Sequence, residues 1–414
     1  MKKHLTVLTF LILAMSAKAQ DIYSVGHYNV TNGTIAALYK NNERLYTAHI
    51  TGMPSKAFKV VCNSEGDVFW LVNHYKNNSL NRVEIRKNDQ VYASMEDVDV
   101  IHINDMYCHN DTIHYAGYQL NESGVATATV WKGEDFSTHW VLGDGIHTSV
   151  IYDADVDKST NIPYFCGYVT DSIQKAAVWK DRDLFYSYQG QHPYGWNMQY
   201  SYAIEISIDN GQVYTLGYGD DWTFIWKDNS IVYEFDDLEI VNCLYTHQGD
   251  SYYTYCYPHG MYYAVYKNRG QILELPLNNQ TGVQRICGDL NDIYMVGKSS
   301  GQGCIWKNFE VYLQPNNCSR LYDMVVSYAN VGIDEPDEGA FAVYPNPANG
   351  ILFVQTRRAT SLPDQNEYRI TNMMGQTLLQ GRITVETQQI DISDLPAGMY
   401  FISLANITQK FIVK

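Results

Sequence analysis

Short apolar and aromatic runs, separated by polar turns, recur at a regular spacing between residues 23 and 327. Each recurrence contains a triplet of an apolar residue, a residue that is usually aromatic, and Lys, followed by a turn and another aromatic strand. Successive triplets lie 40 to 48 residues apart. The seven triplets are Leu38-Tyr39-Lys40, Ile85-Arg86-Lys87, Val130-Trp131-Lys132, Val178-Trp179-Lys180, Ile225-Trp226-Lys227, Val265-Tyr266-Lys267 and Ile305-Trp306-Lys307. Chance does not produce this regularity, so the region is interpreted as seven copies of one structural unit.

Each unit contains about four strand-like segments and no long helical pattern. Runs such as 113–118 and 213–218 are rich in β-branched and aromatic residues, and Asp228-Asn229 supplies turn chemistry between two of them. Four strands in 40 to 50 residues are typical of a propeller blade, so the sequence predicts an all-β, seven-bladed β-propeller. We expect the aromatic residue of each triplet to pack against the next blade and its Lys to reach solvent at the turn.

The order of strands within the units predicts how the ring closes. Residues 23–28 match the second strand of a unit, and the missing first strand follows the seventh triplet, at residues 319–326. We therefore expect residues 319–326 to pair with residues 22–28, which removes an open sheet edge. An open solenoid of the same units is the alternative.

The first 19 residues have the pattern of a secretory signal peptide. Lys2 and Lys3 precede a short apolar run from Leu5 to Met15, and an A-x-A cleavage site, Ala17-Lys18-Ala19, follows it. The run is too short to cross a bilayer as a helix, and no later stretch approaches 18 consecutive apolar residues. We predict export, with cleavage before Gln20 and no transmembrane segment in the mature chain.

The repeats stop near Ser327 and give way to a different composition. Residues 328–339 are polar and contain Gly, Pro, Asp and Glu, which is typical of a linker, and residues 340–414 are short alternating strands. The domains predicted are a signal peptide at 1–19, a propeller at 20–327, a linker at 328–339 and a small β-sandwich at 340–414.

The last segment resembles the type A C-terminal sorting domain of the Bacteroidetes type IX secretion system. The residues that carry the resemblance are Tyr344, Pro345, Asn346, Pro347, Gly375, Leu395, Pro396 and Gly398, with Ile390-Asp391-Ile392 and the terminal Lys410 to Lys414. The resemblance implies an immunoglobulin-like sandwich that the outer-membrane translocon recognises. It also implies release of the protein or its attachment to the cell surface. A purely structural sandwich is the alternative.

Charge and cysteine content limit the classes of function. The chain holds 29 Lys and Arg against 45 Asp and Glu, for a formal net charge of −16, which argues against binding nucleic acid through a broad basic surface. The acid excess belongs to the repeats, because residues 340–414 are nearly balanced. The eight Cys have no C-x-x-C spacing. We interpret many of them as buried apolar residues, and disulfides are the alternative.

No nucleophile, metal or nucleotide motif is recognisable, and no cofactor is predicted. Asp153, Asp155 and Asp157 alternate like the start of a calcium loop, but Lys158 stands where Gly is expected, so an exposed acidic turn is the preferred interpretation. His192, Trp196 and His259 lie in predicted loops and are candidates for ligand contact.

Two functions remain open on these grounds. The first is a secreted or cell-surface propeller that binds a protein or a glycan without catalysis. The alternative is an extracellular carbohydrate-active enzyme, a polysaccharide hydrolase or lyase, with acidic residues and His in the propeller channel.

Overall fold

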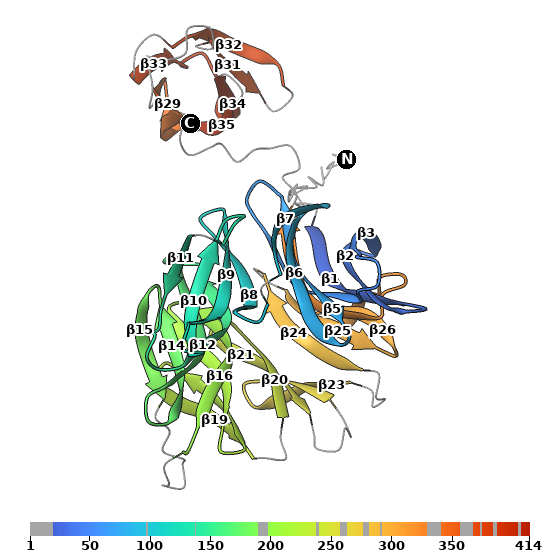
Figure 1. Cartoon of the computed structure of the whole chain (residues 1–414). Helices are drawn as coiled ribbons and strands as arrows, with labels where there is room; N and C mark the ends of the chain where they lie inside the picture. The colour runs from blue at the N-terminus through green and yellow to red at the C-terminus, as the bar shows by residue number, and fades with distance from the viewer. Residues whose placement is uncertain are drawn as a thin grey trace, which may run out of the picture. The chain divides into compact units, whose positions relative to one another are not determined.

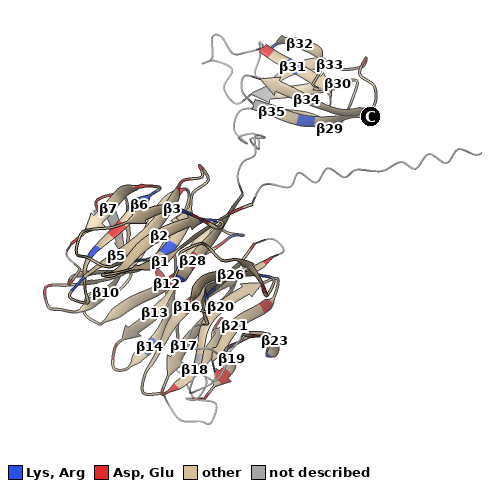
Figure 2. Ribbon diagram, turned by 90° about the vertical axis from the view of Figure 1, so that its right-hand side faces the viewer, with Lys and Arg blue, Asp and Glu red and all other residues tan. Residues whose placement is uncertain are grey.

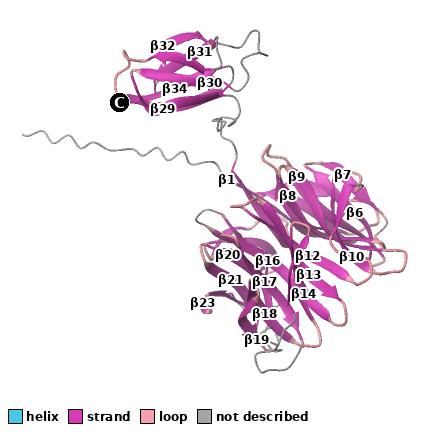
Figure 3. Cartoon of the chain, turned by 90° about the vertical axis from the view of Figure 1, so that its left-hand side faces the viewer, coloured by secondary structure: helices cyan, strands magenta, loops and turns pink. Residues whose placement is uncertain are grey.

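The computed structural model describes residues 20–96, 98–136, 138–188, 198–236, 240–256, 263–275, 281–289, 292–328, 341–356, 367–372, 375–383, 387–404 and 407–414. All regular structure in these ranges is strand, and no helix among them is long and apolar enough to cross a membrane (Figure 3). By their contacts, residues 20–327 form one compact unit and residues 328–414 belong to another.

The first unit consists of seven four-stranded antiparallel sheets that follow one another along the chain (Figure 1). The first three blades are β28 (Arg320–Tyr328), β1 (Gln20–Val30), β2 (Gly33–Lys40) and β3 (Glu43–Ala48); β4 (Ser55–Cys62), β5 (Val68–Lys76), β6 (Ser79–Lys87) and β7 (Gln90–Met95); β8 (Ile101–His109), β9 (Thr112–Leu120), β10 (Ala126–Lys132) and β11 (Thr138–Val141).

The other four blades follow, and in all seven blades the strands are named from the innermost strand outward. They are β12 (Ser149–Asp157), β13 (Ile162–Thr170), β14 (Gln174–Lys180) and β15 (Asp183–Tyr188); β16 (Ser201–Asp209), β17 (Gln212–Gly219), β18 (Trp222–Lys227) and β19 (Ser230–Phe235); β20 (Ile240–His247), β21 (Asp250–Cys256), β22 (Tyr263–Lys267) and β23 (Gly270–Leu275); β24 (Gly282–Gly288), β25 (Ile293–Ser299), β26 (Gln302–Lys307) and β27 (Glu310–Leu313).

The ring closes as the sequence predicts. Strand β28 pairs with β1, so blade 1 is built from both ends of the unit, and the last blade comes to lie beside it (Figure 1). The backbone of Ser319 donates to the carbonyl of His27 at 2.9 Å, which fixes the start of β28 on β1. The prediction of a seven-bladed propeller clasped by residues 319–326 is confirmed, and the open solenoid is excluded.

Seven apolar clusters hold the blades together, and each cluster lies between two neighbouring blades. The cluster between blades 2 and 3, for example, joins Phe69, Ile85 and Met95 to Tyr115 and Trp131. One four-stranded sheet cannot bury both of its faces alone, so each blade depends on both of its neighbours. None of the eight Cys residues, all of which lie in the described ranges, forms a disulfide, and five of them are buried, in agreement with their interpretation as packing residues.

The triplet aromatic residues pack against the preceding blade, so the expectation that they pack on the next one is wrong. Trp226 of blade 5 stacks on Tyr188 of blade 4, with ring centroids 4.8 Å apart. Val130 and Trp131 show the reason, because adjacent strand residues point to opposite faces. Val130 lies in the cluster with blade 4, whereas Trp131 lies in the cluster with blade 2.

The Lys of the triplet covers an aromatic ring on the neighbouring strand instead of simply extending into solvent. Lys307 lies over the ring of Tyr294 at 5.3 Å and forms an ion pair with Asp292 at 2.8 Å. Lys267 makes the same pair of contacts with Tyr252 and Asp250. The repeated Lys therefore ties the hairpin between the third and fourth strands to the start of the second strand.

The second unit is a small β-domain with its own core. Its seven-stranded sheet runs in the order β32 (Thr377–Arg382), β31 (Glu367–Asn372), β34 (Gly398–Leu404), β35 (Ile407–Val413), β29 (Phe341–Asn349), β30 (Ile351–Thr356) and β33 (Thr387–Asp391). Leu352, Ile370, Ile402 and Phe411 are among the buried residues of its core. The domain thus has the all-β construction that the sequence predicts for the C-terminal segment.

Candidate functional site: the charged ring of the propeller channel

The inner strand of most blades carries a β-bulge, and a charged residue follows it. The register of β4, β8, β12, β16 and β24 shifts immediately before Lys59, Asp105, Asp153, Glu205 and Arg285, respectively. Cys243 and Asp323 take the equivalent places on β20 and β28. We call these seven residues the channel ring: Lys59, Asp105, Asp153, Glu205, Cys243, Arg285 and Asp323.

The bulge also explains the glycine that recurs in the second strand of several units. At Gly167, a Cβ atom would collide with the backbone carbonyl of Val150, which the bulge of β12 turns toward it. Glycine is the residue that allows this close approach of two backbones. The local sequence therefore fixes where the bulge forms and, with it, where the charged side chain lies.

Four carboxylates of the channel ring bind the backbone of the next blade. Asp105 accepts a hydrogen bond from the N–H of Ala154 at 2.9 Å, and Asp153 accepts one from Ile206 at 3.0 Å. The two further links join Glu205 to the N–H of Leu244 at 2.8 Å and Asp323 to the N–H of Val60 at 3.0 Å. Each donor is the residue that follows the ring position of its own blade. These hydrogen bonds replace strand pairing between blades.

The remaining three members of the channel ring complete a circuit around the channel. Lys59 forms ion pairs with Asp105 at 2.6 Å and Asp153 at 3.2 Å, and the Nε of Arg285 lies 3.2 Å from Asp323. The Cys243 thiol donates to the carbonyl of Val283 at 3.9 Å. Every blade is thereby linked to the next, including blade 7 to blade 1. The hydrogen bonds and ion pairs of the channel ring therefore stabilise the closed propeller along its central channel.

The two basic residues do not balance all the acidic ones. Burial raises the pKa of Glu205 to about 8, and the nearby Asp153 carboxylate adds to the rise. Burial also raises the pKa of Asp105 to about 7 against the opposing effect of Lys59, and that of Asp155 to about 6. For Asp153, Lys59 and Arg285 outweigh the effect of burial, and its pKa lies below the usual value. Asp153 therefore carries the charge, and Glu205 carries a proton at neutral pH.

The raised pKa of Glu205 predicts a stability that falls as pH rises. The unfolded carboxyl loses its proton near about pH 4.3, so between that value and about pH 8 the folded protein binds the extra proton. Glu205→Gln keeps an acceptor for Leu244 and needs no proton, so we expect it to stabilise the protein at pH 8 by about 3 kcal/mol relative to its effect at pH 5. Urea unfolding at the two pH values measures this difference.

Glu310→Gln is the matched control for this prediction, because Glu310 is exposed on β27 and lies outside the channel. Its effect should be the same at both pH values. A Glu205→Gln effect that is equally independent of pH would show that Glu205 is ionised in the folded protein.

The inner strands enclose a cavity of about 520 Å³ at the ends where their chains turn outward. All seven inner strands contribute to its wall, which includes Asp105, Glu205, Arg285 and Asp323 of the channel ring, Asp155 of β12 and Lys158 directly after β12. Glycoside hydrolysis uses a pair of carboxylates that flank the scissile bond. Here the ring carboxylates are already bound to backbone N–H groups or to Lys59 and Arg285.

The three Asp of the calcium-loop candidate lie in strand β12, and Asp153 and Asp157 are buried, so the prediction of an exposed acidic turn is wrong for all three. The Asp155 carboxylate accepts the N–H of Ile208 at 2.8 Å, one step further along the blade interface than Asp153. Asp157 caps the turn that follows β12 through Ser159 and Thr160. In the described part of the chain, no group of three or more His, Cys, Asp and Glu side chains is arranged to hold a metal ion.

The predicted contact residues His192, Trp196 and His259 lie outside the described residues, and their role stays a prediction. The channel ring was not recognised in the sequence. A signal for it exists, because a charged residue stands within the first strand of most repeats, as in 57–61, 103–107, 203–207 and 283–287.

The sorting-motif residues make contacts that shape the C-terminal domain. The side chain of Asn346 accepts the N–H of Ile412 at 3.0 Å and donates to the carbonyl of Lys410 at 3.3 Å, which joins β29 to β35. The Tyr400 hydroxyl donates to the carbonyl of Pro396 at 2.7 Å, and Gly375 occupies a turn with φ of 77°. Residues 342–414 match the family described as "Secretion system C-terminal sorting domain". The chain therefore ends in a type IX secretion sorting domain.

The sorting domain indicates secretion or attachment to the cell surface, and it implies engagement with the secretion machinery. No curated protein matches the chain. Among solved structures, the chain is similar to apo AztD from Citrobacter koseri, with 9% identity, 74% of this chain and 98% of that chain covered, and a TM-score of 0.42.

It is also similar to PorZ, a surface component of the type IX secretion system of Porphyromonas gingivalis, with 10% identity, 94% and 74% covered, and a TM-score of 0.31. A third similarity, to an acylaminoacyl peptidase of Pyrococcus horikoshii with 11% identity and a TM-score of 0.40, covers 81% of this chain but only 56% of that one. At such identities the likeness concerns the fold alone.

Proposed function

We propose that the propeller is a non-catalytic binding module, which the sorting domain delivers to the outside of the cell to bind a protein or a glycan. The observation that carries the proposal is the circuit of the channel ring. The acidic side chains that a hydrolase would use at this place each hold a neighbouring blade. The carboxylates of the channel therefore stabilise the closed propeller. We infer that ligands bind on the outer surface of the propeller.

The surface charge supports a binding role for the same unit. Acidic residues mark many of its turns in Figure 2, and the repeats carry nearly all of the net negative charge. Loops and turns on a rigid scaffold are where binding residues concentrate. A propeller offers many such loops around a frame that the interblade clusters keep fixed.

The test is a binding screen of the secreted protein against a glycan array and against cell-surface proteins, run beside an assay for degradation of the same polysaccharides. The proposal expects saturable binding of at least one ligand and no release of reducing ends or unsaturated products. Degradation that Glu205→Gln abolishes, while the variant stays folded, would establish the enzyme alternative instead.

A further inference from the structure

The seam where the ring closes forms a second pocket, of about 650 Å³. It lies between blade 7, blade 1 and the loop that joins β27 to β28, so it exists because the two ends of the unit meet. This volume is within the range of about 300–1,000 Å³ that ligand sites occupy. The pocket is lined by Tyr28, Asn29, Arg44, Gly301, Gln302, Asn316, Asn317, Cys318 and Ser319.

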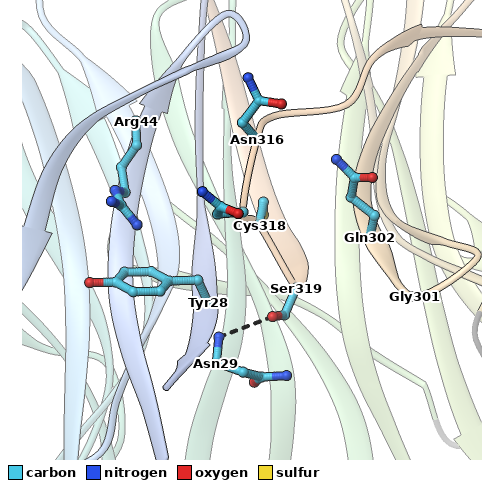
Figure 4. A pocket seen from close by; sticks show the side chains of 9 residues that line it. Tyr28, Asn29, Arg44, Gly301, Gln302, Asn316, Cys318 and Ser319 are labelled. Carbon is cyan, nitrogen blue, oxygen red and sulfur yellow. Dashed lines mark hydrogen bonds between the residues drawn. The ribbon is translucent and has the colours of Figure 1, made fainter. Parts of the chain in front are cut away.

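The floor of this seam pocket is fixed to both blades. Gly303 of blade 7 donates to the carbonyl of Cys318 at 2.9 Å, and Ser319 donates to His27 of blade 1 at 2.9 Å. The Ser319 hydroxyl accepts the N–H of Asn29 at 3.1 Å, the bond drawn in Figure 4. A pocket held in this way needs little reordering when it binds, which favours affinity.

One positively charged side chain, that of Arg44, lines this pocket. Arg44 of β3 lies with its guanidinium carbon 4.3 Å from the centre of the Tyr28 ring, and Figure 4 shows its side chain extending toward that ring. Among the described residues no carboxylate lies within ion-pair distance of Arg44, although the repeats are strongly acidic. Stacking on Tyr28 orients the planar guanidinium and leaves its N–H donors for a ligand.

Amide side chains surround this cation. Figure 4 shows Gln302 across the pocket from Arg44, with Asn316 between them. Gln302 uses its Nε2 on the carbonyls of Gln314 and Pro315, at 3.4 and 3.2 Å, which leaves its oxygen as an acceptor. Within the described chain, the side-chain amides of Asn316 and Asn317 have no hydrogen-bond partner, and both residues are exposed. Amides both donate and accept, as sugar hydroxyl groups do.

We propose that this seam pocket binds a carboxylate-bearing sugar of an acidic glycan, with the carboxylate on Arg44 and the hydroxyl groups on Gln302, Asn316 and Asn317. The inference rests on the proposed binding function and names its ligand class and site. An acidic peptide fits less well, because protein interfaces depend on buried aromatic and apolar anchors and this pocket offers a single aromatic face, that of Tyr28.

The test measures binding of the full secreted protein to oligosaccharides of galacturonate, glucuronate and mannuronate and to sialyllactose, each beside its carboxyl-reduced form. We expect at least one acidic sugar to bind, and its carboxyl-reduced form to bind about tenfold more weakly or worse. Arg44→Gln should lower affinity for the acidic sugar by a similar factor and leave the weak binding of the reduced form unchanged. Asn316→Ala should weaken both forms equally.

Arg182→Gln is the matched control, because Arg182 is also exposed and stacked on an aromatic ring, that of Trp140, at 4.8 Å in another part of the propeller. It removes the same charge and should leave binding unchanged. The proposal is overturned if none of the acidic sugars binds, if the reduced sugar binds equally well, or if Arg44→Gln has no more effect than Arg182→Gln.

Binding of poly-glutamate that depends on Arg44, without binding of any acidic sugar, would show an acidic protein partner and would also overturn the proposal. Binding of some other glycan or protein in the screen, unaffected by Arg44→Gln, would contradict this site and leave the proposed function in place. The two failures are therefore distinguishable.

Discussion

Replacing Lys59 with Met is expected to destabilise the propeller by about 3 kcal/mol, because removal of one partner leaves buried charges uncompensated. Lys59 is the only basic residue of the channel ring that contacts both Asp105 and Asp153, and its side chain is 16% exposed. Both carboxylates would then face each other without their shared cation. The free energy of unfolding in urea, measured at pH 7, gives the size of the loss.

Lys40→Met is the matched control for this change. Lys40 forms an ion pair with Asp21 at 2.9 Å, but its side chain is 38% exposed, so its loss should cost about 1 kcal/mol or less. Adding Asp105→Asn to Lys59→Met should restore part of the stability, because Asn keeps an acceptor for Ala154 and removes one charge. If Lys59→Met costs no more than Lys40→Met, the channel ring does not fasten the blades.

Deletion of residues 340–414 is expected to abolish delivery of the propeller to the outside of the cell while leaving it folded. The sorting domain has a core of its own, and residues 20–327 form a separate compact unit, so the propeller does not need the deleted domain for packing. The truncated chain should accumulate in the periplasm. Mass spectrometry of periplasmic, outer-membrane and culture fractions measures the distribution.

Protease resistance of the retained propeller is the control for that experiment, since a misfolded chain would also fail to leave. A truncated protein that is folded and still reaches the surface or the medium would show that residues 340–414 are not the export signal. A truncated protein that is degraded in the periplasm would show that the two units depend on each other for stability.

The repeat could be predicted from the sequence because the same local pattern of strands and turns recurs seven times along the chain. The triplet ending in Lys marks each third strand, and the missing first strand of the first unit requires β28 to pair with β1. The direction in which the triplet aromatic points was not predictable in the same way. It depends on which face of a strand meets which neighbour, and a period of two residues does not say whether a face belongs to the preceding or the next blade.

The channel ring depends on contacts between residues far apart in the chain. Asp323 binds the backbone of Val60, and Arg285 contacts Asp323 of the neighbouring blade and Asp153 across the channel. In the sequence, Asp153 and Asp155 look like exposed turn residues, because charged side chains usually stay in solvent. Their burial becomes reasonable only when the ring supplies hydrogen bonds and basic partners. The seam pocket could not be predicted from the sequence either, because its lining residues come from both ends of the propeller and lie together only when the ring closes.

Hydrogen exchange along the inner strands tests the closed ring most directly. The account predicts that the amides of β28 exchange as slowly as those of β12, because both are inner strands fixed by pairing and by the channel ring, although β28 comes from the far end of the unit. In Lys59→Met, both strands should lose protection together. Exchange of β28 that is much faster than that of β12 in the unmutated protein would contradict a ring closed by this strand.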